Sequence, residues 1–341
     1  MRILYALQGT GNGHVARARD LVPRFSQYAE VDVLIAGSAS DLDLGFPVKF
    51  RKYGLAMVYN SNGAVSYWRS LFQNKLITFL KDVFQLPVKD YDVVVIDFEA
   101  ITSYACRLRG IKALQLSHQA AYWSMLSPRP DKKSLHWEFV LKYMSPAHYK
   151  IGFHFERFDT FILPPIIRKE IRQLEISHQH KCVVYLPSYS SVDLVDFFRQ
   201  FHNHSFVVFS PKASPIVDVH IEVRAADVNG FLQELAACSH VICGAGFETP
   251  SEALFLGKSV LTIPIVGQYE QACNAAALAA MGVQVLPKLD QEYVNEVAEF
   301  LNQSQPKQVT FPDYAEELVQ CIVNNVQNGT EYDDISSLQV W

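Results

Sequence analysis

Short apolar runs alternate with longer amphipathic stretches along the first third of the chain. An apolar run at residues 3–7 ends in a glycine-rich turn, and an amphipathic stretch then leads to a second apolar run at 31–36. This alternation predicts a βαβ unit, which implies a parallel sheet. Two further apolar runs predict strands at 93–96 and 113–116. The stretch between them, residues 100–109, predicts a helix that Gly110 ends as a C-cap.

The same alternation starts again in the second half of the chain. Strands are predicted at 182–186, 205–209, 219–223, 241–243 and 260–263. Helices are predicted between them at 191–201, 229–237 and 250–255. We therefore expect an α/β protein with two Rossmann-like doubly wound domains facing across a cleft. A ligand should bind in this cleft, because ligand crevices of such sheets lie beyond the carboxyl ends of the strands.

The length of 341 residues is comfortable for two domains. Pro164 and Pro165 stiffen the chain after the first block of strands and place the boundary there. We expect an N-terminal domain at 1–164, a linker at 165–180 and a C-terminal domain at 181–312. We expect a helix at 313–328 and a tail at 329–341. Packing of this helix against the N-terminal domain is one possible arrangement.

The composition narrows the classes of function. The formal net charge of −5 argues against a nucleic-acid binder, which would show a basic stripe. No apolar run reaches the length of about 20 residues that spans a membrane, so we expect a cytoplasmic protein. The six cysteines are scattered without C-x-x-C spacing, which indicates neither a zinc site nor a redox motif.

The clearest candidate for chemistry follows the strand predicted at 241–243. Gly244, Ala245, Gly246 and Phe247 form a turn, and Pro250 suits the first position of the next helix. Glycines let a ligand approach the backbone, and the free N–H groups at a helix start favour a phosphate. The alternative is a plain strand-to-helix turn whose glycines only permit tight packing.

Glu252 also has two interpretations. The run from Thr249 to Glu252 matches a capping box, in which the glutamate bonds back to the start of the helix. Alternatively, its carboxylate accepts hydrogen bonds from ribose hydroxyls. Downstream, the polar cluster of Gln268, Glu270 and Gln271 follows another strand and could bind a polyhydroxy ligand, unless it is only a solvated loop.

Together these motifs resemble the nucleotide-sugar glycosyltransferases of the GT-B fold, and most closely the bacterial N-acetylglucosaminyltransferases that complete the lipid-linked peptidoglycan precursor. The likeness rests on a small-residue turn with Thr-x-x-Glu, here ending in Glu252, and on a Pro-rich strand end followed by Glu270-Gln271 and Asn274-Ala275. The Gly-Thr-Gly-Gly-His loop of that family is matched by residues 9–14, with Asn12 as an extra residue. Residues 127–148 have no counterpart, so the acceptor is the inference that transfers least.

The resemblance implies a UDP-sugar donor and an unknown acceptor, either lipid-linked or a saccharide. Backbone amides from Gly244 to Phe247 would hold the diphosphate, Glu252 the ribose, and Gln268, Glu270 and Gln271 the transferred sugar. The first-domain loop of Gly11, Asn12 and Gly13 would also touch the diphosphate. Amides and a helix dipole can stabilise a leaving diphosphate without a metal ion, so no metal and no cofactor are expected.

The acceptor hydroxyl needs a general base, and His14 at the tip of the first loop is the first candidate. Its alternative role is to pack or position the loop. Asp97, at the end of a predicted strand, is the second candidate, and Glu99 and His118 are candidates for the wall of the cleft. Structural or binding roles are alternatives for all three.

Three other functions remain open alternatives. A nicotinamide-dependent dehydrogenase fits poorly, because His14 replaces the last fingerprint glycine and no acidic residue follows the second strand. A nucleotide-sugar 2-epimerase and a non-catalytic nucleotide-sugar sensor would share the fold.

Two motifs could suggest a metal site. The Asp-x-Asp at Asp41 and Asp43 is more typical of a turn than of a metal site. The histidine pairs at 178/180 and 202/204 have no cysteine or carboxylate nearby at the spacing of metal ligands, so surface histidines are the simpler interpretation.

Residues 66–84 carry large apolar side chains at helical spacing, together with Arg69, Lys75 and Lys81. An ordinary core helix has this pattern. A helix lying on a membrane surface, facing a lipid-linked acceptor, has it too. Peripheral contact with the inner face of a membrane is therefore a second hypothesis for this segment.

Overall fold

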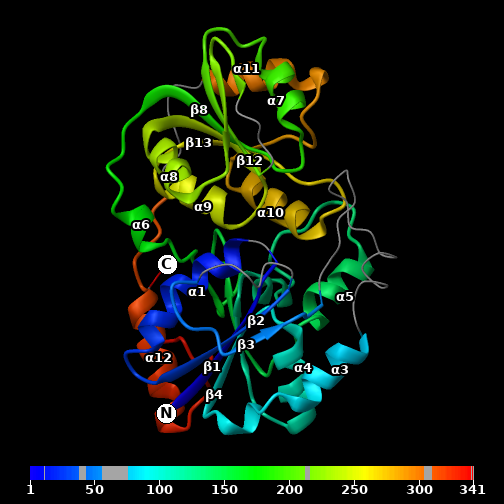
Figure 1. Cartoon of the computed structure of the whole chain (residues 1–341), viewed down its shortest axis with the longest axis vertical. Coiled ribbons are helices and arrows are strands. Elements are labelled where there is room, and N and C mark those ends of the chain that lie inside the picture. Colours follow the sequence, from blue (N-terminus) through cyan, green and yellow to red (C-terminus); the bar gives the residue numbers. More distant parts are fainter. Residues whose placement is uncertain are drawn as a thin grey trace.

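A computed structural model describes residues 1–10, 12–37, 44–55, 76–211, 216–302, 309–338 and 340, and for Asn12, Ile216 and Val217 only the backbone. Gly11, Asp41, Asp43 and residues 66–75 of the amphipathic segment lie outside the described residues. Two stacked α/β units account for the described chain (Figure 1). The prediction of two doubly wound α/β domains is confirmed.

The first sheet has seven strands in the order β3-β2-β1-β4-β5-β6-β7, all paired in parallel. The strands are β1 (Arg2–Gln8), β2 (Glu30–Ala36), β3 (Phe50–Lys52), β4 (Val93–Asp97), β5 (Leu114–Ser117), β6 (Tyr149–Phe153) and β7 (Ile162–Leu163). Alternate residues of β1 enter two separate apolar clusters: Ile3 and Tyr5 join one, Leu4 and Ala6 the other. Both faces of the sheet are therefore buried beneath helices, as a doubly wound fold requires.

Four α-helices and two short 3₁₀ turns are described between the strands of this sheet. They are α1 (Asn12–Phe25), α3 (Leu76–Gln85), α4 (Ala100–Arg109) and α5 (Leu135–Tyr143), with short 3₁₀ turns η1 (Val88–Asp90) and η2 (His118–Trp123). The prediction for α4 is confirmed at both ends, since Glu99 caps the first amides and Gly110 closes the helix with a φ of 67°.

The second sheet has the order β10-β11-β9-β8-β12-β13-β14, with an antiparallel edge pair between β10 and β11 that the sequence patterns did not predict. Its strands are β8 (Gln179–Tyr185), β9 (Ser205–Ser210), β10 (Ile216–Val217), β11 (Ile221–Ala225), β12 (Cys238–Gly244), β13 (Ser259–Ile263) and β14 (Gln284–Val285). Its helical segments are α7 (Ser191–Phe198), α8 (Val228–Ala237), α9 (Glu248–Phe255), α10 (Tyr269–Ala280), η3 (Gln291–Tyr293) and α11 (Val294–Leu301).

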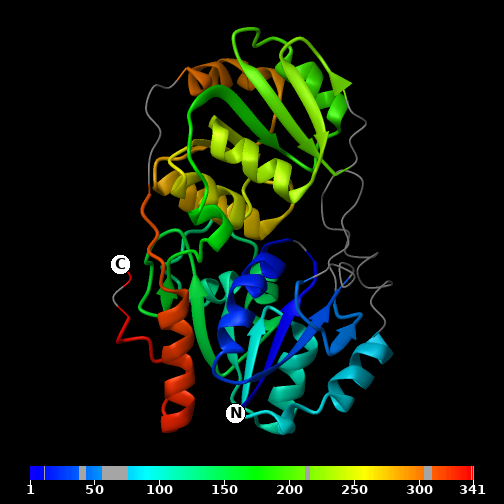
Figure 2. The ribbon, with the colours of Figure 1, turned by 60° about the vertical axis from the view of Figure 1, so that its left-hand side comes forward.

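The segment through α6 (Lys169–Arg172) joins the two sheets, and another leads back from the second sheet to α12 (Ala315–Asn328). α12 lies along α1 of the first unit (Figure 2), where Glu316 approaches Arg24 to 3.4 Å. Arg172 ties the two connecting segments together, because it donates to the carbonyl oxygens of Phe311 (3.1 Å) and Pro312 (2.7 Å).

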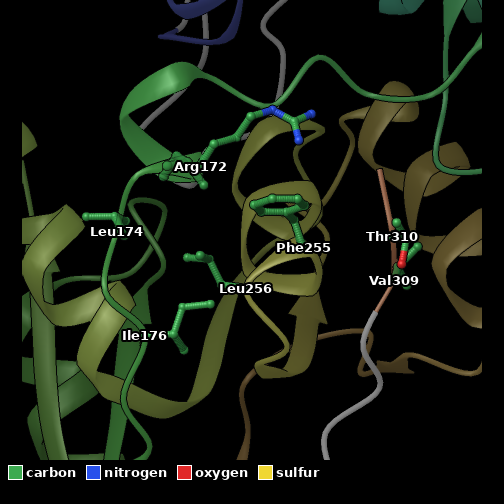
Figure 3. A pocket seen from close by; sticks show the side chains of 8 residues that line it. Arg172, Leu174, Ile176, Phe255, Leu256, Val309 and Thr310 are labelled. Carbon is green, nitrogen blue, oxygen red and sulfur yellow. The ribbon is translucent and has the colours of Figure 1, made fainter. Parts of the chain in front are cut away.

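Beside Arg172 lies a small pocket of about 160 Å³ between the connecting segments and the end of α9 (Figure 3). Its lining is mainly apolar, with Leu174, Ile176, Phe255 and Leu256 facing the space. The guanidinium carbon of Arg172 lies 4.9 Å from the centre of the Phe255 ring. The pocket thus belongs to the connecting segments and not to the carboxyl ends of the strands.

The two units share one apolar cluster. Phe153 and Phe155 of the first unit and Phe247 of the second belong to it, and the Phe155 and Phe247 ring centres are 5.1 Å apart. This contact brings the end of β6 against the turn that follows β12. It therefore joins the regions beyond the carboxyl ends of both sheets, where a ligand site is expected.

Candidate functional site

The turn after β12 leaves an open space beside its backbone. A Cβ atom added to Gly246 would meet no atom within 4 Å in the described part of the chain. One added to Gly244 would meet only ordinary contacts, the nearest being Gln271 Oε1 at 3.6 Å. Neither glycine has a positive φ. Packing and backbone strain therefore do not require these glycines, which argues against a turn built only for tight packing.

The helix after this turn begins two residues earlier than predicted. α9 starts at Glu248, and its N-cap residue Phe247 makes no side-chain cap. Thr249 and Pro250 are thus the second and third helical residues, and the predicted capping box is wrong. The buried carboxylate of Glu252 accepts instead from Arg168, at 2.6 Å from Nε and 2.8 Å from Nη2. Such a two-point contact fixes the carboxylate more firmly than a cap would.

His14 and Asp97 lie together at the ends of neighbouring strands. β1 and β4 are parallel partners with Leu7 opposite Asp97, and His14 enters two residues after the start of α1. The His14 Nδ1 atom lies 2.8 Å from Asp97 Oδ1. Burial raises the pKa of Asp97, but the charge of Arg17 and the contacts with His14 outweigh it and hold the pKa below its usual value. Asp97 is therefore an ionised acceptor that orients the ring of His14.

His118 packs at the interface between the units. Its Nδ1 lies 2.8 Å from the carbonyl oxygen of Phe153, and its Nε2 lies 2.8 Å from Asn274 Oδ1. Its ring stacks on Phe247 with ring centres 4.0 Å apart and an interplanar angle of 9°. Burial lowers its pKa, which favours a neutral ring. His118 thus supports the turn at Phe247, while Glu99 is the α4 cap and is fully buried.

The second polar cluster lies at the start of α10. Gln268 is the residue before the helix, and Glu270 and Gln271 belong to its first turn. Gln271 Oε1 accepts from the amide of Ile265 (2.9 Å), and Glu270 Oε1 accepts from Nε2 of Gln119 in the first unit (3.0 Å). Glu270 therefore faces the first unit, and Gln271 holds the start of the loop after β13 in place.

Gly13, in the first glycine loop, lies against Glu248 at the start of α9. A Cβ atom added to Gly13 would lie 3.0 Å from Cγ of Glu248. Arg17 joins this contact, because its Nη2 donates to Glu248 Oε1 (2.7 Å). The structure thus brings together the two predicted loops, with the His14–Asp97 pair on one side and the Gly246 turn on the other.

Sequence motifs did not indicate a role for Arg17, Glu248 or Arg168. Arg17 follows His14 by three residues, so the two side chains share one helix face, and this spacing could have indicated it. Glu248 stands inside the recognised turn motif. Arg168 carried no local signal, since its partner Glu252 is 84 residues away in the chain.

A family model described as glycosyl transferase family 1 matches residues 1–304. The chain belongs to glycosyl transferase family 1. A comparison with curated proteins gave no match. The family assignment excludes the dehydrogenase alternative and confirms the resemblance to nucleotide-sugar glycosyltransferases.

Solved structures agree with this assignment. This family 1 chain is similar to Acinetobacter baumannii MurG (TM-score 0.54, 14% identity, 96% of this chain and 99% of that chain). It is also similar to Arabidopsis thaliana UGT89C1 complexed with quercetin (TM-score 0.60, 12% identity, 97% and 96%). A third structure is LpCGTa in complex with UDP (TM-score 0.55, 12% identity, 98% and 99%). These likenesses show the GT-B fold. Together with the family assignment, they identify the protein as a glycosyltransferase.

Proposed function

We propose that this glycosyltransferase moves a sugar from a UDP-sugar to an acceptor hydroxyl without a metal ion. One observation carries the proposal: the open backbone at Gly246, before α9, lies in the same interface as the His14–Asp97 pair. The second unit thus offers a backbone suited to binding a phosphate, and the first unit offers a histidine suited to accepting a proton. Structures of this fold in complex with UDP and with thymidine diphosphate support a nucleoside diphosphate as the leaving group.

The donor would lie along the turn and the first residues of α9. Amides from Gly244 to Phe247 and the positive end of the helix would hold the diphosphate. Glu248 and Glu252 would repel it, but Arg17 and Arg168 each pair with one of these carboxylates and weaken the repulsion. Each oxygen of Glu252 keeps a free lone pair beside its Arg168 contact, because a carboxylate has about four acceptor positions. Glu252 can therefore still accept from a ribose hydroxyl.

The transferred sugar would lie toward α10, within reach of Glu270, Gln271 and Gln268. His14 would receive the proton of the acceptor hydroxyl on Nε2, since Nδ1 faces Asp97. The acceptor oxygen then forms a bond to the anomeric carbon as the bond from that carbon to the diphosphate breaks. The electron pair of the broken bond leaves with UDP, whose new negative charge the amides of the turn stabilise.

An acceptor-dependence assay tests this function. We expect UDP release from a UDP-sugar to rise strongly when a suitable acceptor is added, and to persist after EDTA, because the turn supplies the charge stabilisation. Release without any acceptor, together with a 2-epimer product, would favour the epimerase alternative. Binding of the donor without turnover by any member of an acceptor panel would favour the non-catalytic sensor.

We further propose that the acceptor is presented at a membrane surface on the cytoplasmic side. None of the described helices is both long and apolar enough to span a bilayer. α3, however, exposes Ile77 (85%), Leu80 (53%) and Phe84 (61%) at a spacing of one helix face. Lys81 is exposed on the same helix. An apolar face with adjacent basic charge is what a helix lying on an anionic bilayer presents.

Vesicle co-sedimentation checks this surface. We expect the wild type to sediment with vesicles containing anionic lipid, and an Ile77→Asp, Phe84→Asp variant to remain in solution. Val192→Asp is the matched control, because Val192 is similarly exposed (59%) but lies on α7 of the second unit. Equal sedimentation of all three proteins, or of none, would remove the membrane proposal and leave a water-soluble saccharide as the acceptor.

A further inference from the structure

Arg17 connects the proton-accepting pair to the donor-binding helix. It lies on α1 and is only 5% exposed. Its Nη1 donates to both carboxylate oxygens of Asp97 (3.0 and 2.9 Å), and its Nη2 donates to Glu248 Oε1 (2.7 Å). We call this arrangement of Asp97, Arg17 and Glu248 the Arg17 bridge. It spans the interface, because Asp97 ends β4 of the first sheet and Glu248 begins α9 of the second unit.

Neighbouring residues leave space for Glu248 and hold Arg17 in place. The absent side chain of Gly13 makes room for Glu248, since a Cβ atom there would lie 3.0 Å from Glu248 Cγ. On its other side, the guanidinium carbon of Arg17 lies 5.3 Å from the centre of the Phe153 ring. The guanidinium is therefore held by two carboxylates and one aromatic face, which leaves it one favourable position.

The bridge exists in full only when the two units are in contact. If the units separate, Glu248 loses Arg17, and Arg17 keeps Asp97 as its single carboxylate partner. A charge that stays buried without its partner is costly, so Arg17 and Glu248 stay paired wherever the interface excludes water. Docking of α9 therefore acts on Arg17, the residue that holds the Asp97 carboxylate beside His14.

We propose that Arg17 is a positioning residue that aligns Asp97 and His14 for proton transfer when Glu248 docks against it. This inference rests on the proposed transferase function. It assigns Arg17 and Glu248 a role that acts through Asp97 and His14 and not through contact with the acceptor. Alignment of the acid–base pair would then be coupled to closure of the site around the donor, which limits proton transfer to the closed state.

Glu248→Ala tests the bridge without touching His14 or Asp97. We expect kcat to fall about thirtyfold, because small misplacements of a catalytic pair cost up to about a hundredfold. The dissociation constant for UDP should change less than about threefold, since the backbone amides remain. Glu248→Gln, which keeps one acceptor oxygen, should lose only about fivefold in kcat and serves if the alanine variant does not fold.

Glu316→Ala is the matched control, because it removes a second arginine contact on α1, the 3.4 Å approach to Arg24, away from the site. Small-angle scattering gives a readout that does not depend on transfer: Glu248→Ala should have a larger radius of gyration than the wild type, and Glu316→Ala should not. An unchanged kcat, a parallel loss of kcat and UDP affinity, or unchanged scattering would each overturn the coupling. An inactive wild type would contradict the transferase function, and the scattering would still decide whether Glu248 holds the units together.

Discussion

Replacing His14 by alanine should lower the rate of sugar transfer by about a thousandfold, in the middle of the range that general-base catalysis contributes. The Asp97 contact at Nδ1 (2.8 Å) leaves Nε2 of His14 as the atom that can accept a proton. Without the imidazole, the acceptor hydroxyl must lose its proton to water during attack. UDP affinity should stay within about threefold of the wild-type value, because the turn at Gly246 is unchanged. Steady-state kinetics and calorimetric titration with UDP measure the two quantities.

His202→Ala is the matched control for this variant, because His202 is an exposed histidine of the second unit. It should transfer sugar at the wild-type rate. A His14→Ala variant that retained full transfer would remove the proposed base. A loss of UDP affinity as large as the loss of rate would instead mean that His14 only positions the loop or binds the donor.

Gly246→Val should reduce UDP affinity by at least about a hundredfold while leaving the folded protein as stable as before. An added Cβ atom would meet no described atom within 4 Å, and Gly246 does not adopt a positive φ, so we expect the fold to accommodate the side chain. The space that it fills is the one assigned to the diphosphate. Losing close contact with several amides costs on the order of 3 kcal/mol, which corresponds to about a hundredfold in affinity.

Thermal unfolding and calorimetric titration of the Gly246→Val variant separate the two effects. A lower melting temperature without added ligand would show that Gly246 serves packing after all. Unchanged UDP affinity would place the diphosphate elsewhere. His14→Ala and Gly246→Val should therefore fail in complementary ways, the first in rate and the second in binding.

Local signals predicted the elements whose ends depend on neighbouring residues. The α4 prediction holds because a carboxylate N-cap and a glycine C-cap act within one turn of the helix. The predicted start of α9 was wrong because a distant residue, and not the local sequence, decides it. Thr249, Pro250 and Glu252 have the composition of a helix start, but Arg168 takes the Glu252 carboxylate from elsewhere in the fold. A tertiary ion pair thus overrides a local cap that the sequence pattern favours.

The candidate site was predictable as two separate motifs but not as one connected structure. The glycine turns and His14 stand out along the chain, because helix starts and glycines carry local meaning. The pairing of Arg17 with Glu248 spans 231 positions, and that of Gln119 with Glu270 spans 151. No periodicity encodes such distances. The domain boundaries at 164 and 181 stay a proposal, which the separate sheets and the return of α12 to α1 support.

A thermal-shift panel of UDP-, GDP- and dTDP-sugars on the wild-type protein tests the central claim, that the turn before α9 holds the diphosphate of a sugar nucleotide. At about a hundred times its dissociation constant, a ligand stabilises the folded state by about 2.7 kcal/mol, which raises the melting temperature by several degrees. We predict such a rise with UDP-sugars, larger than with the other two classes. No rise with any of the three classes would contradict the account.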